Sequence, residues 1–137
     1  LSGWTFKTGS CCTFKTCDDC TFTTSYFCTF DTGCNCTFTT SSYGTFNTGD
    51  NSKFNTSNSC TFTTGFGCTF KTDYRCIFKT DKGCIFDTGS ECTFSLYDIH
   101  SCKFKSFDGY SIILDLEDKK HYVLTKELIE LLKVQNG

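Results

Sequence analysis

The sequence predicts an all-β fold, a parallel β-solenoid of octapeptide repeats closed at its C-terminal end by a β-hairpin and a short helix. Two observations lead to it: a unit of eight residues recurs without a gap through most of the chain, and Phe fills the same place in every unit. Composition agrees, because 16 Phe and 13 Cys among 137 residues, with abundant Thr and no Pro, favour extended strands. We therefore expect one stacked repeat unit with a small appendage.

The repeat has the form C-T-F-x-T-[GSD]-x-x and fills residues 4–99 with twelve octads. The first place is Cys in nine octads and is taken by Trp4, Gly44 and Ser52 in the others, and the fifth is Thr except at Leu96. Five β-prone residues followed by a Gly, Ser or Asp position predict a strand and then a corner. The third places give the expected core ladder of Phe6, Phe14, Phe22, Phe30, Phe38, Phe46, Phe54, Phe62, Phe70, Phe78, Phe86 and Phe94.

Alternation along a strand assigns each place of the octad to a face. Side chains at the first, third and fifth places share one face, and those at the second and fourth places share the other. Because Phe must lie inside, Cys and the fifth-place Thr are expected beside it in the core. The second and fourth places are expected to face solvent.

The corner residues indicate how many octads make one coil. The sixth place alternates through Ser25, Gly33, Ser41 and Gly49, and equivalent corners should stack on one another. This alternation favours two octads, or 16 residues, per coil and six coils in all, with Phe27 stacked on Tyr43. Three octads per coil stays open as an alternative, and so does the handedness.

The string CTFKTDYRCIFKTDKGCIFDTGSECTF, residues 68–94, resembles the uncharacterised octapeptide-repeat proteins of phage and other microbial sequences, whose motif is of the type N-C-T-F-x-T-G. The resemblance covers residues 4 to about 105 and implies the repeat fold, with no established activity. The chain is also similar, more distantly and with a longer period, to the pentapeptide-repeat solenoids.

Charge and hydropathy exclude several classes of partner. A formal net charge of -2, with 13 basic and 15 acidic residues, supplies no basic surface for a nucleic acid. No run approaches the roughly 20 apolar residues of a membrane span. We expect no nucleic-acid partner, no membrane partner and no small-molecule ligand, and leave a protein partner or self-association through the C-terminal cap open.

The cysteines are expected to be mostly reduced. Like residues on neighbouring coils would be close enough for a disulfide, but their Cβ vectors run parallel and do not converge. Reduced thiols favour a cytoplasmic, infected-cell or virion setting. The four cysteines outside the repeat register are expected to be the oxidised or reactive ones: Cys11, Cys17, Cys34 and Cys102.

No metal site or cofactor site is predicted. Cys17 and Cys20 have the close spacing of a zinc pair, but no second pair accompanies them and Cys20 is expected to point inward. His100 and His121 lie outside the repeat without a partner at nucleophile or ligand spacing, and we expect them to be surface or cap residues.

The register breaks after Leu96, and a displaced motif follows at residues 102–104, two residues late. We place the solenoid at residues 1–106 and the cap at residues 107–137. Strands at 110–116 and 121–124 should form a hairpin, and Thr125 should cap a helix over 126–134.

The cap is expected to cover the strand edges and Phe rings of the last coil. The residues expected to form its inward face are Ile112, Leu114, Val123, Leu128 and Leu132. The alternative is that Leu128, Ile129 and Leu132 dock a protein partner or a second copy.

An enzyme needs a constellation of unlike residues, and the repeat offers none, so no catalytic residues are predicted. The sequence favours a structural or interaction protein, a rigid scaffold of the kind that a phage or virus particle contains. The alternative is a binder of a repetitive surface such as ice through outward Thr columns. Its candidate residues are Thr21, Thr23, Thr37, Thr39, Thr61 and Thr63.

Overall fold

Each octad forms one short strand at its second to fourth places, where Thr, Phe and a variable residue alternate outward and inward. The computed structural model describes residues 3–136. The repeat strands are β1 (Thr5–Lys7), β2 (Thr13–Lys15), β3 (Thr21–Thr23), β4 (Thr29–Asp31), β5 (Thr37–Thr39), β6 (Thr45–Asn47), β7 (Lys53–Asn55), β8 (Thr61–Thr63), β9 (Thr69–Lys71), β10 (Ile77–Thr80), β11 (Ile85–Asp87) and β12 (Thr93–Leu96). They are followed by the 3-10 turn η1 (Ile99–Ser101), β13 (Lys103–Phe104), β14 (Ile112–Asp115), β15 (Lys120–Val123) and the helix α1 (Lys126–Asn136).

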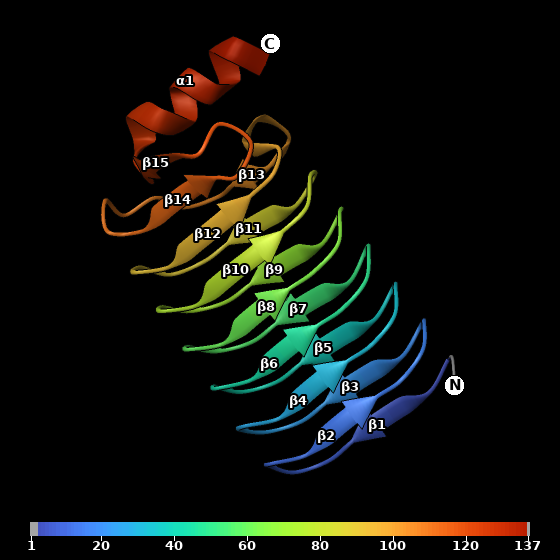
Figure 1. The fold of residues 1–137 in the computed structure, drawn as a ribbon. Coiled ribbons are helices and arrows are strands. Elements are labelled where there is room, and N and C mark those ends of the chain that lie inside the picture. The colour runs from blue at the N-terminus through green and yellow to red at the C-terminus, as the bar shows by residue number, and fades with distance from the viewer. Residues whose placement is uncertain (1–2, 137) are drawn as a thin grey trace.

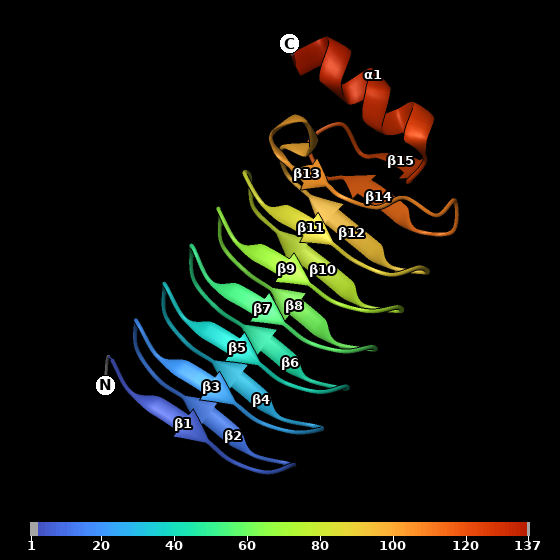
Figure 2. The same cartoon turned by 180° about the vertical axis from the view of Figure 1, so that it is seen from behind.

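The strands stack in parallel into two sheets. The odd sheet has the order β1-β3-β5-β7-β9-β11-β13, and the even sheet runs β2-β4-β6-β8-β10-β12-β14-β15 (Figures 1 and 2). Phe6 pairs with Phe22 and Phe14 with Phe30, an offset of one 16-residue turn. This register confirms two octads per coil.

The Phe ladders fill the space between the sheets, as predicted. Within a sheet the rings stack face to face, with Phe38 and Phe54 at 4.9 Å between centroids and 2° between planes. Between sheets they meet edge to face, with Phe38 and Phe46 at 5.2 Å and 79°. Both arrangements suit the ring quadrupole, so each central ring gains contacts along the stack and across it.

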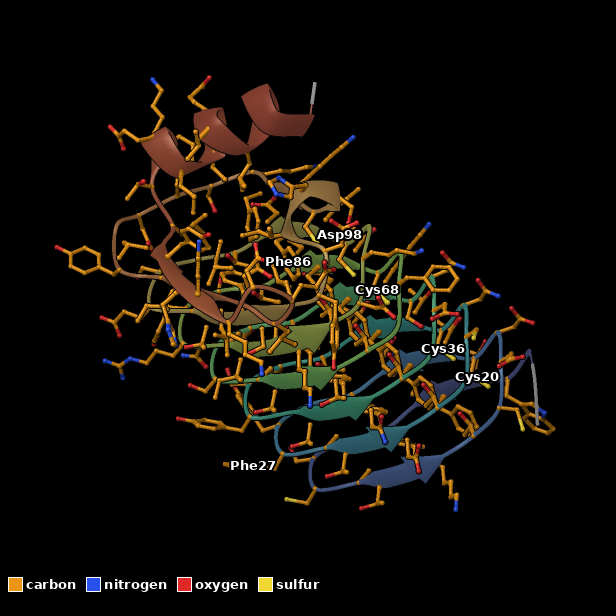
Figure 3. All side chains as sticks on the ribbon, turned by 45° about the horizontal axis from the view of Figure 1, so that its top comes forward. Cys20, Phe27, Cys36, Cys68, Phe86 and Asp98 are labelled. Carbon is orange, nitrogen blue, oxygen red and sulfur yellow. The ribbon has the colours of Figure 1, made fainter. Side chains whose placement is uncertain are left out.

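First-place cysteines line the core beside the Phe ladders because a thiol fits the narrow corner and can donate to its carbonyls. The Cys36 Sγ lies 3.5 Å from the Cys17 carbonyl oxygen of the coil below and 3.6 Å from the Cys34 oxygen. Where Ser52 replaces Cys, its hydroxyl instead accepts a hydrogen bond from the Cys36 N–H at 3.2 Å. Figure 3 shows Cys20, Cys36 and Cys68 following one another along the stack.

The corners combine a left-handed residue with a close approach between coils. Eighth-place residues have positive φ even where they are not glycine, as at Phe27 (60°) and Tyr43 (62°). The sixth-place Gly49 has ordinary φ, but a Cβ there would lie 2.7 Å from the Cys34 Sγ and 3.1 Å from backbone atoms of the coil below. Glycine at this place therefore allows a close approach between neighbouring coils.

The solenoid makes about seven turns where the sequence predicted six coils. β13 stacks on β11 with Phe104 over Phe86, and β14 stacks in parallel on β12 with Ile113 over Phe94. The seventh turn thus lies on both sides of the boundary placed at residues 106 and 107. The turn η1 accommodates the two extra residues. Cys102 therefore returns to the inward column and is buried, so the prediction that it lies outside the repeat register was wrong.

The hairpin of β14 and β15 is antiparallel, as predicted, but its inward face differs from the expected one. Ser111, Ile113 and Asp115 are buried, whereas Ile112 is 45% exposed and Val123 is 51% exposed. The apolar run of Ile112, Ile113 and Leu114 has no alternation of its own. Stacking on β12 fixes the face, because Ile113 must continue the Phe column.

Helix α1 lies at the C-terminal end of the stack (Figure 1). The Leu128 N–H donates to the Thr125 hydroxyl at 3.2 Å, which confirms the predicted N-cap. Leu128 is buried, and Ile129 and Leu132 are half-buried against the core, while Leu131 is exposed. The helix thus turns one apolar edge toward the seventh coil.

Candidate functional site

The outward Thr pairs lie where the sequence placed them, but only four of the six residues adjoin. Thr21 pairs with Thr37 and Thr23 with Thr39 on the odd sheet. Thr61 and Thr63 lie on the even sheet. This third Thr pair therefore lies on the opposite face of the molecule from the other two pairs.

Charged and amide side chains bound this four-residue array. Lys7 stands beside Thr23 on the coil below, and Lys53 and Asn55 stand beside Thr37 and Thr39 on the coil above. The arrangement of paired Thr residues therefore extends over two coils, and the second-place column alone continues for one more coil to Thr5.

Aromatic side chains gather at the corners that join odd strands to the even strands after them. Tyr26, Phe27, Tyr43 and Tyr74 are all about half exposed there. Phe27 and Tyr43 stack at 4.9 Å and 8°, as predicted. We call these residues the aromatic corner. One of them, Phe27, projects from the stack in Figure 3.

Charged residues continue this corner toward the C-terminal end. The Arg75 guanidinium lies 5.7 Å from the centre of the Tyr74 ring, and its Nε donates to the Glu91 carboxylate at 2.8 Å. The hydrogen bond to Glu91 and its negative charge raise the pKa of Arg75. The pair is more than half exposed, so it orders the corner and contributes little to stability.

The cysteines differ sharply in accessibility. Of the four that the sequence set apart, Cys11 and Cys17 are exposed, Cys34 is half-buried and Cys102 is buried. Burial raises the pKa of the Cys36 and Cys102 thiols, which lowers the fraction present as the nucleophilic thiolate. Access therefore favours reaction at Cys11 and Cys17.

We predict that limited alkylation of the native protein at pH 8 will label Cys11 and Cys17 well before Cys36 and Cys102, as read by peptide mass spectrometry. Denaturation without reductant should then expose most first-place cysteines as free thiols, because parallel Cβ vectors disfavour bridges along a column. The residues to follow are Cys20, Cys28, Cys36, Cys60, Cys68, Cys76, Cys84 and Cys92. Bridges at most of these positions would contradict the expected reduced state.

Metal-ligating side chains do not cluster in the part of the chain that the structure describes. No group of three or more His, Cys, Asp or Glu residues could hold a metal ion among residues 3–136. His121 is exposed on β15, and His100 lies in η1 beside a groove.

That groove lies between α1 and the last strand of the odd sheet. Its volume is about 520 Å³. Ile85, Phe104, Ile129 and Leu132 supply its apolar walls, and His100, Lys103 and Lys105 stand among the polar lining residues. Of the three residues considered for partner docking, Ile129 and Leu132 line this groove, while Leu128 is buried against the protein's own core.

Sequence reasoning missed the groove because no periodic signal marks it. Its walls come from η1, where the repeat has two extra residues, and from β13 and α1. The basic pair Lys103 and Lys105 on a strand that ends its sheet was the one available clue.

Comparison with protein families, with curated proteins and with solved structures finds no match to this chain. Within residues 3–136, no helix has the length and apolar character needed to cross a bilayer.

Proposed function

We propose that the protein is a non-catalytic structural or interaction protein, a rigid scaffold whose side chains on the faces, corners and end contact other proteins. The observation that supports this most is the continuous pair of Phe ladders, with centroid spacings near 5 Å from Phe6 to Phe104. In every coil, the residues at the inward places take part in this packing. Variation in sequence is left to the outward places and the corners.

Stiffness is the property that such a stack supplies. Each interior ring contacts neighbours on its own sheet and across the core, and each corner is hydrogen-bonded to the corner above, for example through the Asn35 N–H and the Asp50 carbonyl at 2.9 Å. Bending the rod would open contacts on a whole series of coils at once. A rod of this kind suits a phage or virus particle, the setting that the octapeptide-repeat resemblance favours.

The alternative, ice binding, is supported by one observation, the stacked pairs Thr21 and Thr37 with Thr23 and Thr39. A regular lattice of ice would need a flat rank longer than two coils for tight adsorption. Lys7 and Lys53 project from the same face at either end of the array. The scaffold proposal is therefore the better supported of the two.

Two measurements separate these proposals, one in extracts and one on the purified chain. Lysine-directed cross-linking in extracts of the native source should join the protein repeatedly to the same polypeptide through a defined set of lysines. A thermal-hysteresis assay at high protein concentration should show no activity. Clear hysteresis that is lost on replacing Thr21 and Thr37 by Lys would instead establish the ice-binding function.

A further inference from the structure

The two sheets of the solenoid end differently. The even sheet continues past the repeat through β14 and β15, whereas the odd sheet stops at β13. Among residues 3–136, no strand stacks on β13. Its outer backbone groups therefore form an open sheet edge at the C-terminal end of the odd sheet.

The coils below show which groups an added strand would use. The Lys103 N–H donates to the Cys84 carbonyl at 3.0 Å, and the Lys105 N–H donates to the Phe86 carbonyl at 2.9 Å. One rung higher, the equivalent acceptors are the carbonyls of Cys102 and Phe104. A parallel strand added to β13 would have a central residue with one residue on each side of it. The backbone N–H groups of the two flanking residues would donate hydrogen bonds to these two carbonyls.

The groove lies beside this edge. Residues of α1 form its other wall, so the site has a strand on one side and a helix on the other. Figures 1 and 2 show α1 beyond β13 at the end of the stack. Its volume of about 520 Å³ is within the range of sites that hold ligands. The Phe104 ring is incompletely buried, and Ile129 and Leu132 face the same space.

The register assigns a side-chain type to each position of the added strand. Its central residue would lie over Phe104, toward the core, and must be apolar. The residues on either side would point outward over Lys103 and Lys105. No Asp or Glu lines the groove, so acidic residues complete these two pairs.

The chain already uses this pairing within itself. Asp87 lies in register over Lys71 at the fourth place of neighbouring coils, and Asp31 lies over Lys15. Lys105 continues the column of Lys71 and Asp87. The column therefore alternates Lys, Asp and Lys, and an acidic residue stacked on Lys105 would continue it.

We propose that β13 and α1 form a β-strand addition site for an extended segment of a partner protein with the pattern acidic–apolar–acidic. The inference rests on the proposed role as an interaction protein and names the partner segment that this end would bind. Main-chain hydrogen bonds supply affinity, and the two lysines with the apolar groove supply selectivity.

The test uses the full chain and a short labelled peptide with the central sequence Asp-Phe-Asp, followed by fluorescence anisotropy. Binding should saturate, and Lys103→Glu should weaken it roughly tenfold through loss of one attractive pair and gain of one repulsive pair. Lys53→Glu is the matched control, because Lys53 occupies the same second place on the same sheet in the middle of the stack. It should leave binding unchanged.

Peptide backbone methylation tests the register independently of charge. Methylating the amide nitrogens of the two acidic residues removes both donors to β13 and should abolish binding. Methylating the central Phe nitrogen should have little effect, because that amide points away from β13.

A peptide with Lys-Phe-Lys should bind Lys103→Glu better than it binds the parent protein. Equal binding to the parent and to Lys103→Glu, or equal loss from both methylation patterns, would overturn the proposal. Failure of every peptide would remove strand addition at β13, whereas reproducible cross-links elsewhere on the rod would leave the scaffold function standing.

Discussion

Replacing Phe38 by Ala will lower the free energy of unfolding by about 3–5 kcal/mol. Its ring stacks on Phe22 at 5.1 Å and Phe54 at 4.9 Å and meets Phe30 and Phe46 edge to face across the core. Neither neighbour on its own sheet can move into the gap, because the hydrogen-bonded strands hold their spacing. Chemical denaturation followed by circular dichroism measures the loss.

The matched control is Phe66→Ala. Phe66 lies at a corner with 44% of its surface exposed, and its removal should cost less than about 1 kcal/mol. If the two substitutions cost the same, the Phe ladders do not dominate the stability of the fold.

Ending the chain after Ser106 will convert a discrete species into one that associates end to end or precipitates. The deletion removes β14, β15 and α1, uncovering the edge of β12 and one face of the Phe94 ring, which Ile113 otherwise adjoins. An uncovered parallel edge is a template for another chain. Light scattering should report the larger mass, while the sheet signal in circular dichroism survives because the lower coils are intact.

Replacing Leu131 by Ser is a useful comparison, since this helix residue is 51% exposed and its loss should leave the species discrete. If the truncated chain is as small and as soluble as the parent, residues 107–137 do not protect the stack. Leu128, Ile129 and Leu132 would then be better interpreted as a partner-docking helix edge.

The repeat made much of the fold predictable. Phe at every third place fixes the inward face, and the Gly and Ser alternation at the sixth place fixes the coil length, because both express contacts that recur on each coil. The seventh coil was missed since its two strands follow insertions. β13 is offset by 18 residues from β11, and β14 by 19 residues from β12.

Local pattern also could not choose the inward face of β14. Ile112, Ile113 and Leu114 are all apolar, and only the strand beneath them selects Ile113. The groove at β13 has the same origin, because it depends on how α1 crosses the stack. For the candidate site, the sequence therefore provided the Thr pairs and the helix residues but neither the open edge nor its basic flanks.

The offset of 16 residues between paired strands sets the unit by which this molecule can change its length. Removing or duplicating a whole coil, such as residues 36–51, would return every later strand to its own sheet and every corner to its own column. Removing a single octad would transfer all later strands to the opposite sheet and place the aromatic corner against the column of corners that contains Gly33, Gly49 and Gly65. We therefore expect changes in the number of repeats to be tolerated in steps of two octads, each of which alters the length of the stack by one coil.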